Sequence, residues 1–291
     1  MTSQPDWLKL MNMKRVALSI IAACLLAAPG VYAQESEQRE GIRKDLPAHL
    51  RPQNNVTSFH RRSVDSTEKP WQSIGRVNIG GRAHCSGTLV AANIVLTAAH
   101  CLFSKASGQM VVPGIVHFVA GYSRGEHLGH SKVKSYRVGD GYRGEEGATR
   151  ANMGHDWALL VLEEPLGEEL GFLTVPNGWF EPPKPTAPPR PNKRKVQIAA
   201  DVTTAGYPGD RKHILSLEEN CNIITTANQG RILLTSCIAL KGDSGGPILQ
   251  QVDGTWHIIG VQTSALKAGD KISGVGLSAI VYQPYLDILS Q

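Results

Sequence analysis

The chain has 291 residues, of which 41% are hydrophobic and 19% charged, a composition that is ordinary for a globular protein and excludes an intrinsically disordered chain. The net charge of +5 is modest and includes two short basic clusters, Arg61-Arg62 and residues 193–195, so it favours scattered solvated charge over a nucleic-acid-binding surface. The chain also has 30 glycines, 17 prolines and few long periodic stretches, which predicts short strands joined by turns and an all-β fold.

The N-terminus has the pattern of an export signal. A basic pair, Lys14-Arg15, precedes an apolar run over residues 16–28, and residues 31–33 form a small-x-small cleavage site. We therefore expect a signal peptide over residues 1–33 and a secreted or periplasmic product. The run is too short for a membrane span, and no later segment reaches the required length. A lipoprotein signal with an acylated Cys24 is the alternative, which is disfavoured because the chain stays apolar beyond that cysteine.

The rest of the chain divides at a proline-rich segment. Residues 34–55 are polar and lack periodicity, which is typical of a pro-segment or flexible leader. Residues 181–192 contain too many prolines for a central strand and are interpreted as a linker. A first β-unit is predicted over residues 56–180 and a second over 193–291.

Short apolar runs bounded by turn residues predict the strands of both units. The predicted strands are residues 73–79, 85–90, 94–97, 115–120 and 157–162 before the linker, and 196–205, 223–226, 232–235, 247–251, 256–262 and 276–281 after it. Residues 140–154 are rich in glycine and charge and are predicted to be a loop. Residues 284–291 are predicted to form a short C-terminal helix with one apolar face.

Four cysteines remain if Cys24 leaves with the signal, and an even number in an exported chain suggests two disulfides. The members of each pair are close in sequence, so the simplest pairing is Cys85 with Cys101 and Cys221 with Cys237. Each closed loop would contribute on the order of 3 kcal/mol in the chain-entropy model.

Two short strings carry candidate chemistry. The first, Thr97-Ala98-Ala99-His100-Cys101, places a histidine directly after a predicted strand. A histidine in that setting is usually structural, so this string alone does not indicate catalysis. The second, Gly242-Asp243-Ser244-Gly245-Gly246-Pro247, is more specific, because glycines around a serine allow a tight turn and direct successive N–H groups towards one point.

Together and in this order, the two strings resemble the chymotrypsin-like serine peptidases, and the resemblance extends from about residue 70 to the C-terminus. Between them, residues 155–160 are similar to the string that carries the catalytic aspartate in that family. The resemblance implies two six-stranded antiparallel β-barrels and a catalytic triad of His100, Asp156 and Ser244. Other carboxylates in this region are not followed by such a strand.

The implied roles follow from the needs of acyl transfer. His100 takes the proton of the Ser244 hydroxyl as it attacks and returns it to the leaving amine, while Asp156 fixes the imidazole tautomer. The backbone N–H groups of Gly242 and Ser244 form the oxyanion hole, at roughly 3 kcal/mol per donor. By the same resemblance, Thr263 supports the aspartate.

A narrower resemblance to the bacterial glutamyl-endopeptidase-like branch comes from residues 204–210 and the position of Cys237. Ile238 stands where trypsin-like enzymes have a pocket-floor aspartate, and an isoleucine cannot pair with a lysine or arginine side chain. Gln262 stands where the glutamate-specific enzymes have a histidine. Ile238, Gln262, Ser264 and Ala265 therefore predict an uncharged pocket, and neither basic nor glutamate specificity is expected.

The resemblance also implies a zymogen. In the family a freed N-terminal ammonium pairs with the acid before the catalytic serine and orders the oxyanion hole, and Asp243 is that acid here. We expect the new N-terminus near Val56, with a cut between Arg62 and Ser63 as the alternative.

The leading hypothesis is a serine endopeptidase that acts on protein or peptide substrates without a metal or organic cofactor. The 10 histidines show no zinc-ligand spacing. A catalytically silent binding protein is the alternative, which is disfavoured because no triad member is missing. An α/β-hydrolase esterase would need the chain order Ser, Asp, His, whereas the order here is His, Asp, Ser.

Overall fold

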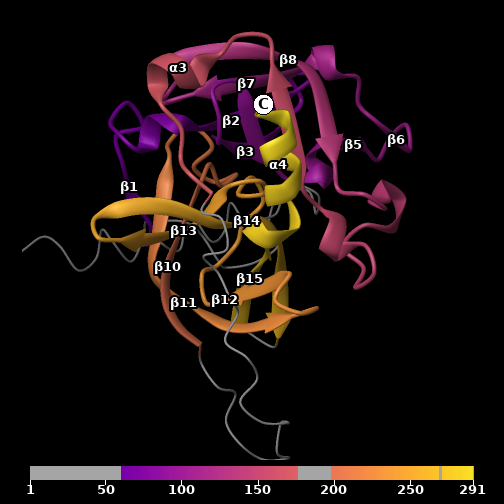
Figure 1. The fold of residues 1–291 in the computed structure, drawn as a ribbon, viewed down its shortest axis with the longest axis vertical. Coiled ribbons are helices and arrows are strands. Elements are labelled where there is room, and N and C mark those ends of the chain that lie inside the picture. The colour runs from indigo at the N-terminus through magenta and orange to yellow at the C-terminus, as the bar shows by residue number, and fades with distance from the viewer. Residues whose placement is uncertain (1–59, 176–197, 269–270, 291) are drawn as a thin grey trace, which may run out of the picture. The chain divides into compact units, whose positions relative to one another are not determined.

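The computed structural model describes residues 60–175, 198–268 and 271–290, and these belong to the compact unit Thr57–Gln291 (Figure 1). The predicted signal peptide, leader and proline-rich linker lie outside the described residues.

The first barrel is closed by six antiparallel strands in the order β2-β3-β4-β9-β8-β7. Their bounds are β2 Ile74–Ile79, β3 Ala83–Leu89, β4 Ile94–Thr97, β7 Val116–Ala120, β8 Gly129–Val138 and β9 Ala158–Leu162. All four residues of β4 are buried, whereas β8 exposes most of its polar side chains. Phe118 and Leu160 are fully buried in the barrel core.

The second barrel also has six strands, in the ring β11-β10-β13-β14-β15-β12, which the pairing of β12 with β11 closes. Their bounds are β10 Ile198–Gly206, β11 Ser216–Ala227, β12 Ile232–Thr235, β13 Pro247–Val252, β14 Thr255–Ala268 and β15 Lys271–Ser278. An Asp-Gly turn joins β13 to β14, with φ of 48° at Asp253 and 79° at Gly254, as a type I′ hairpin requires. A short strand, β1 (Arg62–Ser63), pairs with β11 outside this ring.

The predicted all-β fold with two six-stranded barrels is confirmed, and so is the short C-terminal helix, α4 (Gln283–Leu289). The strand at residues 94–97 has the bounds that the sequence predicted. The sequence missed β8 because lysine, serine and histidine break its apolar alternation. It also missed the shorter elements β1, β5 (Phe103–Ser104), β6 (Gln109–Met110) and α3 (Leu166–Leu170).

One hydrophobic core joins the two barrels. It contains Leu96 and Leu159 of the first barrel together with Leu249 and Val261 of the second. The C-terminal helix α4 returns to the first barrel (Figure 1), where the ring of Tyr285 lies 4.9 Å from that of Trp157. The two barrels therefore pack on each other through this shared core.

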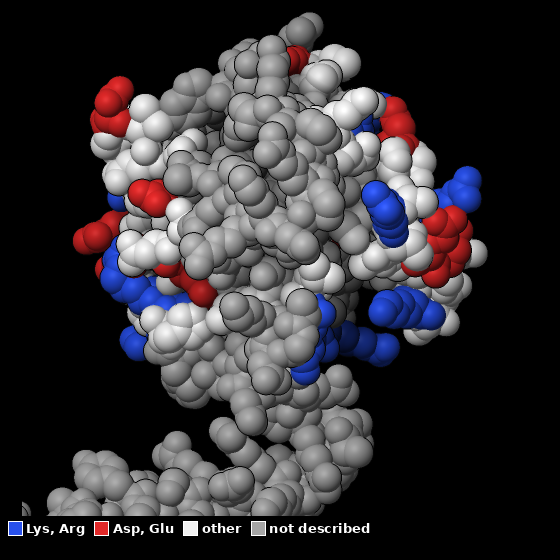
Figure 2. All heavy atoms as spheres, turned by 90° about the horizontal axis from the view of Figure 1, so that it is seen from below, with Lys and Arg blue, Asp and Glu red and all other residues white. Residues whose placement is uncertain are grey.

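Where Figure 2 shows described residues, lysine and arginine side chains lie near aspartate and glutamate side chains. In the part of the chain that the structure describes, none of the helices is long and apolar enough to cross a membrane.

Candidate active site

His100 and Asp156 lie at the same end of two paired strands. β4 pairs with β9 through Thr97 and Ala158, so the residues just after β4 and just before β9 are neighbours. One oxygen of the Asp156 carboxylate accepts the backbone N–H of His100 at 2.8 Å, and the other lies 2.8 Å from His100 Nδ1. Because a carboxylate only accepts, Nδ1 carries a hydrogen, and in the neutral imidazole Nε2 then keeps its lone pair.

The surroundings of Asp156 are largely closed to water, since Asp156 is only 7% exposed. The phenol of Tyr142 is buried nearby, and its pKa is raised by burial first and then by the carboxylates of Asp156 and Glu145. Tyr142 therefore stays neutral and adds no charge near Asp156.

The loop that carries Ser244 is fixed to the first barrel. The Ser244 carbonyl accepts the backbone N–H of Ser86 at 2.8 Å. The Ser86 hydroxyl donates to the carbonyl of Gly242 at 2.9 Å and accepts the backbone N–H of Tyr207 at 2.9 Å. The sequence did not single out Ser86. Its only signal is that it is a small polar residue in a strand whose neighbouring residues are buried.

The glycines beside Ser244 are required by the backbone. Gly242 has φ of 101° and Gly245 has φ of 82°, a region that disfavours any residue with a Cβ. A Cβ at Gly245 would overlap the Thr97 hydroxyl and the Ser86 carbonyl. The close fit of this loop against β3 and β4 therefore depends on glycine.

Along residues 242–245, backbone N–H groups that donate a hydrogen bond to a described residue alternate with N–H groups that do not. Asp243 N–H donates to the Leu240 carbonyl at 3.1 Å, and Gly245 N–H donates to the Gln262 carbonyl at 2.7 Å. Within the described ranges, the N–H groups of Gly242 and Ser244 have no hydrogen-bond acceptor. These two donors are therefore available to a ligand oxygen.

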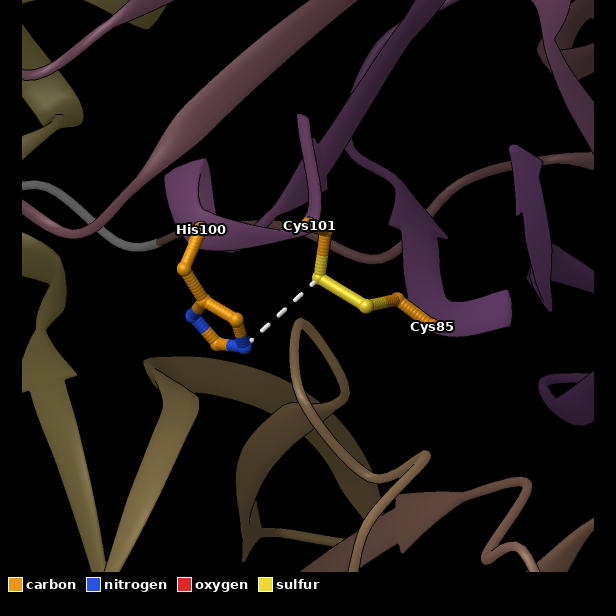
Figure 3. A group of neighbouring side chains, drawn as sticks. All are labelled: Cys85, His100 and Cys101. Carbon is orange, nitrogen blue, oxygen red and sulfur yellow. Dashed lines mark hydrogen bonds between the residues drawn. A yellow bond between two sulfur atoms is a disulfide. The ribbon is translucent and has the colours of Figure 1, made fainter. Parts of the chain in front are cut away.

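Both predicted disulfides are present, between Cys85 and Cys101 and between Cys221 and Cys237. The first lies against the site (Figure 3): His100 Nε2 and the Ser244 carbonyl oxygen each lie 4.0 Å from the sulfur of Cys101. The atoms of Cys85, His100 and Cys101 that could bind a metal ion lie within 4.8 Å of one another, but the two sulfurs are joined in the disulfide. They cannot act as thiolates, so this group does not form a zinc site.

The structure thus brings all three residues of the predicted triad to one place. His100 and Asp156 are hydrogen-bonded, and the backbone carbonyl oxygen of Ser244 lies 4.0 Å from the same Cys101 sulfur that is 4.0 Å from His100 Nε2. Over the residues described, the Ser244 hydroxyl makes no hydrogen bond. The hydrogen bond between a catalytic serine and its histidine is often long in proteins without substrate and tightens only in the complex.

A pocket of about 190 Å³ opens beside Ser244. Its lining consists of Ala239, Leu240, Lys241, Ser244, Gln262, Thr263, Ser264 and Ala265. Three of the four predicted pocket residues are in this lining, and Ile238 is not. The N–H of Ile238 instead donates to the Glu218 carboxylate at 3.1 Å, because this part of the loop faces away from the pocket.

Two side chains on β14 are held by backbone carbonyls of β14 itself and of the neighbouring strand β15. The Gln262 amide donates to the carbonyls of Ser264 and Val275, at 2.6 and 2.8 Å. The Thr263 hydroxyl donates to the carbonyl of Val275 at 3.2 Å, and no hydrogen bond joins Thr263 to Asp156 within the described residues. Support of Asp156 by Thr263 therefore stays a prediction.

Asp243, the predicted activation acid, is buried against Arg61. Its two oxygens accept from two guanidinium nitrogens, each at 2.9 Å. Burial raises the pKa of Asp243, while the guanidinium and the N–H of Leu240 counter the rise. Burial alone would lower the pKa of Arg61, but the carboxylates of Asp243 and Glu218 raise it above its ordinary value. The N-terminus expected near Val56 lies outside the described residues.

Comparisons with known proteins agree with this fold. The family model described as Trypsin matches residues 59–287. The chain is 27% identical over 193 residues to a trypsin-like protease of Streptomyces glaucescens, covering 61% of this chain and 63% of that protein. It is 23% identical over 197 residues to a glutamyl endopeptidase of Bacillus licheniformis, covering 65% of this chain and 52% of that protein. The chain thus spans less than two thirds of the length of either relative.

A solved structure of a Glu endopeptidase in complex with MPD is similar with a TM-score of 0.61 and 20% identity, covering 81% of this chain and 98% of that one. At that identity the likeness shows the fold alone. The Trypsin model, however, matches well over half of the chain and agrees with its two barrels. The chain belongs to the trypsin family of chymotrypsin-like serine peptidases.

Proposed function

We propose that the protein is an exported serine endopeptidase that cleaves peptide bonds through an acyl-enzyme, with His100, Asp156 and Ser244 as the triad. The observation that carries this proposal is the pair of hydrogen bonds from His100 to Asp156, beside a pocket that Ser244 lines. Membership of the trypsin family supports it. The predicted signal peptide and the two disulfides support export, because disulfides persist in oxidising compartments.

In the proposed first half of the reaction, Nε2 of His100 accepts the hydroxyl proton of Ser244 as its oxygen attacks the scissile carbonyl. Asp156 stabilises the imidazolium that forms, and His100 then passes the proton to the leaving amine. The new ester bond joins the acyl group to Ser244.

In the second half, a water molecule gives a proton to His100 and attacks the ester, which restores the Ser244 hydroxyl and releases the acid. In both halves the N–H groups of Gly242 and Ser244 donate to the oxyanion. That neither N–H has another acceptor among the residues described supports this role. The reaction needs no metal or organic cofactor.

The pocket supports a preference for uncharged side chains before the cleaved bond. In the part of the chain that the structure describes, its lining contains no carboxylate to pair with lysine or arginine, and its one charged member, Lys241, is exposed. The Gln262 amide donors are already used by two carbonyls. Neither a basic nor an acidic side chain finds a buried counter-charge among these residues.

A peptide-library digest with purified protein and its Ser244→Ala variant tests the proposal. We expect cleavage after uncharged residues by the first protein and a loss of about 10⁶-fold in kcat for the second, as in other enzymes of this mechanism. The folded state of the variant is checked by circular dichroism.

Equal cleavage by both proteins would reject Ser244 as the nucleophile. If neither protein cleaves while both are folded, the catalytically silent binding protein becomes the better description. Cleavage after lysine, arginine or glutamate would contradict the proposed uncharged pocket but not the proposed triad.

A further inference from the structure

Arg61 carries a buried positive charge at the base of the Ser244 loop. The residue is only 5% exposed. Its guanidinium donates to both oxygens of Asp243 at 2.9 Å, to the Glu218 carboxylate at 2.9 Å and to the carbonyl of Ile238. The adjacent β1 places it there, because Arg62 and Ser63 pair with Leu217 and Ser216 of β11.

These contacts fix both ends of the segment 238–243. At one end Ile238 is held by Arg61 through its carbonyl and by Glu218 through its N–H. At the other end Asp243 is held by Arg61 and in turn accepts the N–H of Leu240 at 2.7 Å. Between them lie Ala239, Leu240 and Lys241, which line the pocket, and Gly242, whose N–H is a proposed oxyanion donor. One guanidinium thus holds the wall of the pocket and the oxyanion loop.

We infer that Arg61 is the positioning residue of this loop, supplying from within the chain the cation that the family resemblance assigned to a freed N-terminal ammonium. The inference rests on the proposed function. It departs from the zymogen prediction, because a chain that is continuous through residues 60–63 already has Asp243 paired. A cut at Arg61-Arg62 or Arg62-Ser63 then separates the cation from β1 and inactivates the enzyme.

Arg62 is the matched control. It neighbours Arg61 but points outward, where its exposed guanidinium pairs with Glu219 at 2.7 Å. A surface pair of this kind contributes little to stability. The two arginines therefore separate loss of the buried cation from loss of positive charge near β1.

The first experiment compares the full chain with its Arg61→Ala, Arg61→Lys and Arg62→Ala variants. For Arg61→Ala we expect a loss of about 10²–10³-fold in kcat, the usual effect of losing an oxyanion donor. Arg61→Lys should recover only part of it, since an ammonium cannot bind both oxygens of Asp243 in the same way. Arg62→Ala should stay within about threefold of the unchanged protein.

Low millimolar guanidinium chloride is then added to Arg61→Ala. Partial recovery of kcat is expected, and a purely structural arginine would not give it. Because Arg61→Ala leaves the buried carboxylates of Asp243 and Glu218 without their guanidinium, the Arg61→Met/Glu218→Gln/Asp243→Asn triple variant provides a folded alternative that has lost the same cation. It should show the same loss of kcat without rescue by guanidinium.

A second measurement does not depend on catalysis. Hydrogen exchange of the amides over residues 238–243 should be faster in Arg61→Ala than in the unchanged protein and unaffected in Arg62→Ala. Unchanged exchange would overturn the inference whatever the activity. Faster exchange in a protein that never cleaves peptides would instead leave the positioning role standing and reject the proposed function.

The state of the N-terminus completes the test. Active molecules labelled at Ser244 with a phosphonate inhibitor should still contain Arg61 when analysed by mass spectrometry. If the labelled chains begin after Arg61, the inference is wrong.

Discussion

At the scale of single residues, the Asp156 carboxylate makes two different contacts with one histidine. One oxygen accepts the backbone N–H of His100 and the other faces Nδ1, each at 2.8 Å. The first contact fixes the carboxylate, and the second fixes the ring and its tautomer. Both acceptors are needed, so a carboxylate is required at this position.

This geometry predicts the effect of Asp156→Asn. An asparagine has one acceptor oxygen, so if that oxygen keeps the backbone N–H of His100, its NH₂ group faces Nδ1. The imidazole must then carry its hydrogen on Nε2 and cannot accept the Ser244 proton. We expect kcat to fall by about 10⁴-fold with little change in the melting temperature.

Steady-state kinetics on a peptide substrate provide the measurement, with Glu163→Gln as an exposed control. A loss in Asp156→Asn of less than about tenfold would contradict the role given to Asp156.

At the scale of elements, strand pairing and tight turns decide where the site forms. The pairing of β4 with β9 brings His100 to Asp156, and β3 holds the Ser244 loop through Ser86. The Ser244 loop approaches β3 and β4 so closely that Gly245 has no room for a side chain.

Two glycines test whether this close approach matters beyond backbone conformation. Gly245 and Gly254 have similar φ, 82° and 79°, but nothing lies within 4 Å of a Cβ placed at Gly254. Gly254→Ala should therefore cost only the strain of the left-handed conformation, about 1 kcal/mol. Gly245→Ala adds steric overlap with Thr97 and Ser86 and should cost at least about 3 kcal/mol.

Urea unfolding of both variants measures the difference. Equal free energies of unfolding would show that the loop can move away from β3 and β4, and that its packing is not a constraint.

At the scale of the whole molecule, the two barrels share one core. Leu96 is fully buried in the cluster that also contains Leu249 and Val261 of the second barrel. Trp71 and Trp157 belong to the same cluster, and Trp256 packs against it. Neither barrel can lose its packing at this junction without exposing the other.

We therefore expect cooperative unfolding with the disulfides intact. Tryptophan fluorescence reports on the shared core, and far-ultraviolet circular dichroism reports on the strands of both barrels. The two signals should give the same midpoint of unfolding. Leu96→Ala should lower the free energy of unfolding by about 2–5 kcal/mol and should lower both midpoints together. Leu266→Ala, at a side chain that is 51% exposed, is the control. Two separate midpoints would show that the barrels unfold independently.

How far the sequence predicts the fold depends on how local the signal is. The runs at 94–97 and 232–235 are apolar and sharply bounded, and both match the observed strands. β8 was missed because its alternation is carried by few apolar residues, with Val133 fully buried between exposed lysines. The candidate triad was predicted from motifs, and the hydrogen bonds of His100 to Asp156 agree with it.

Other parts of the site had no local signal. Ser86 and Arg61 lie far from Ser244 in the sequence, and their partners are set by the packing of one barrel on the other and by the pairing of β1 with β11. Ile238 was placed in the pocket by counting residues, whereas the structure turns its backbone towards Arg61 and Glu218.

By itself, the sequence determined the class of fold and the residues that can carry the chemistry, because short-range patterns of polarity and glycine encode these; it suggested the simplest pairing of the cysteines, which the structure shows. Only the tertiary structure decided which groups hold the Ser244 loop, which side chains line the pocket and which cation meets Asp243. Contacts between residues far apart in the chain arise when the barrels close and pack, and no short stretch of sequence records them.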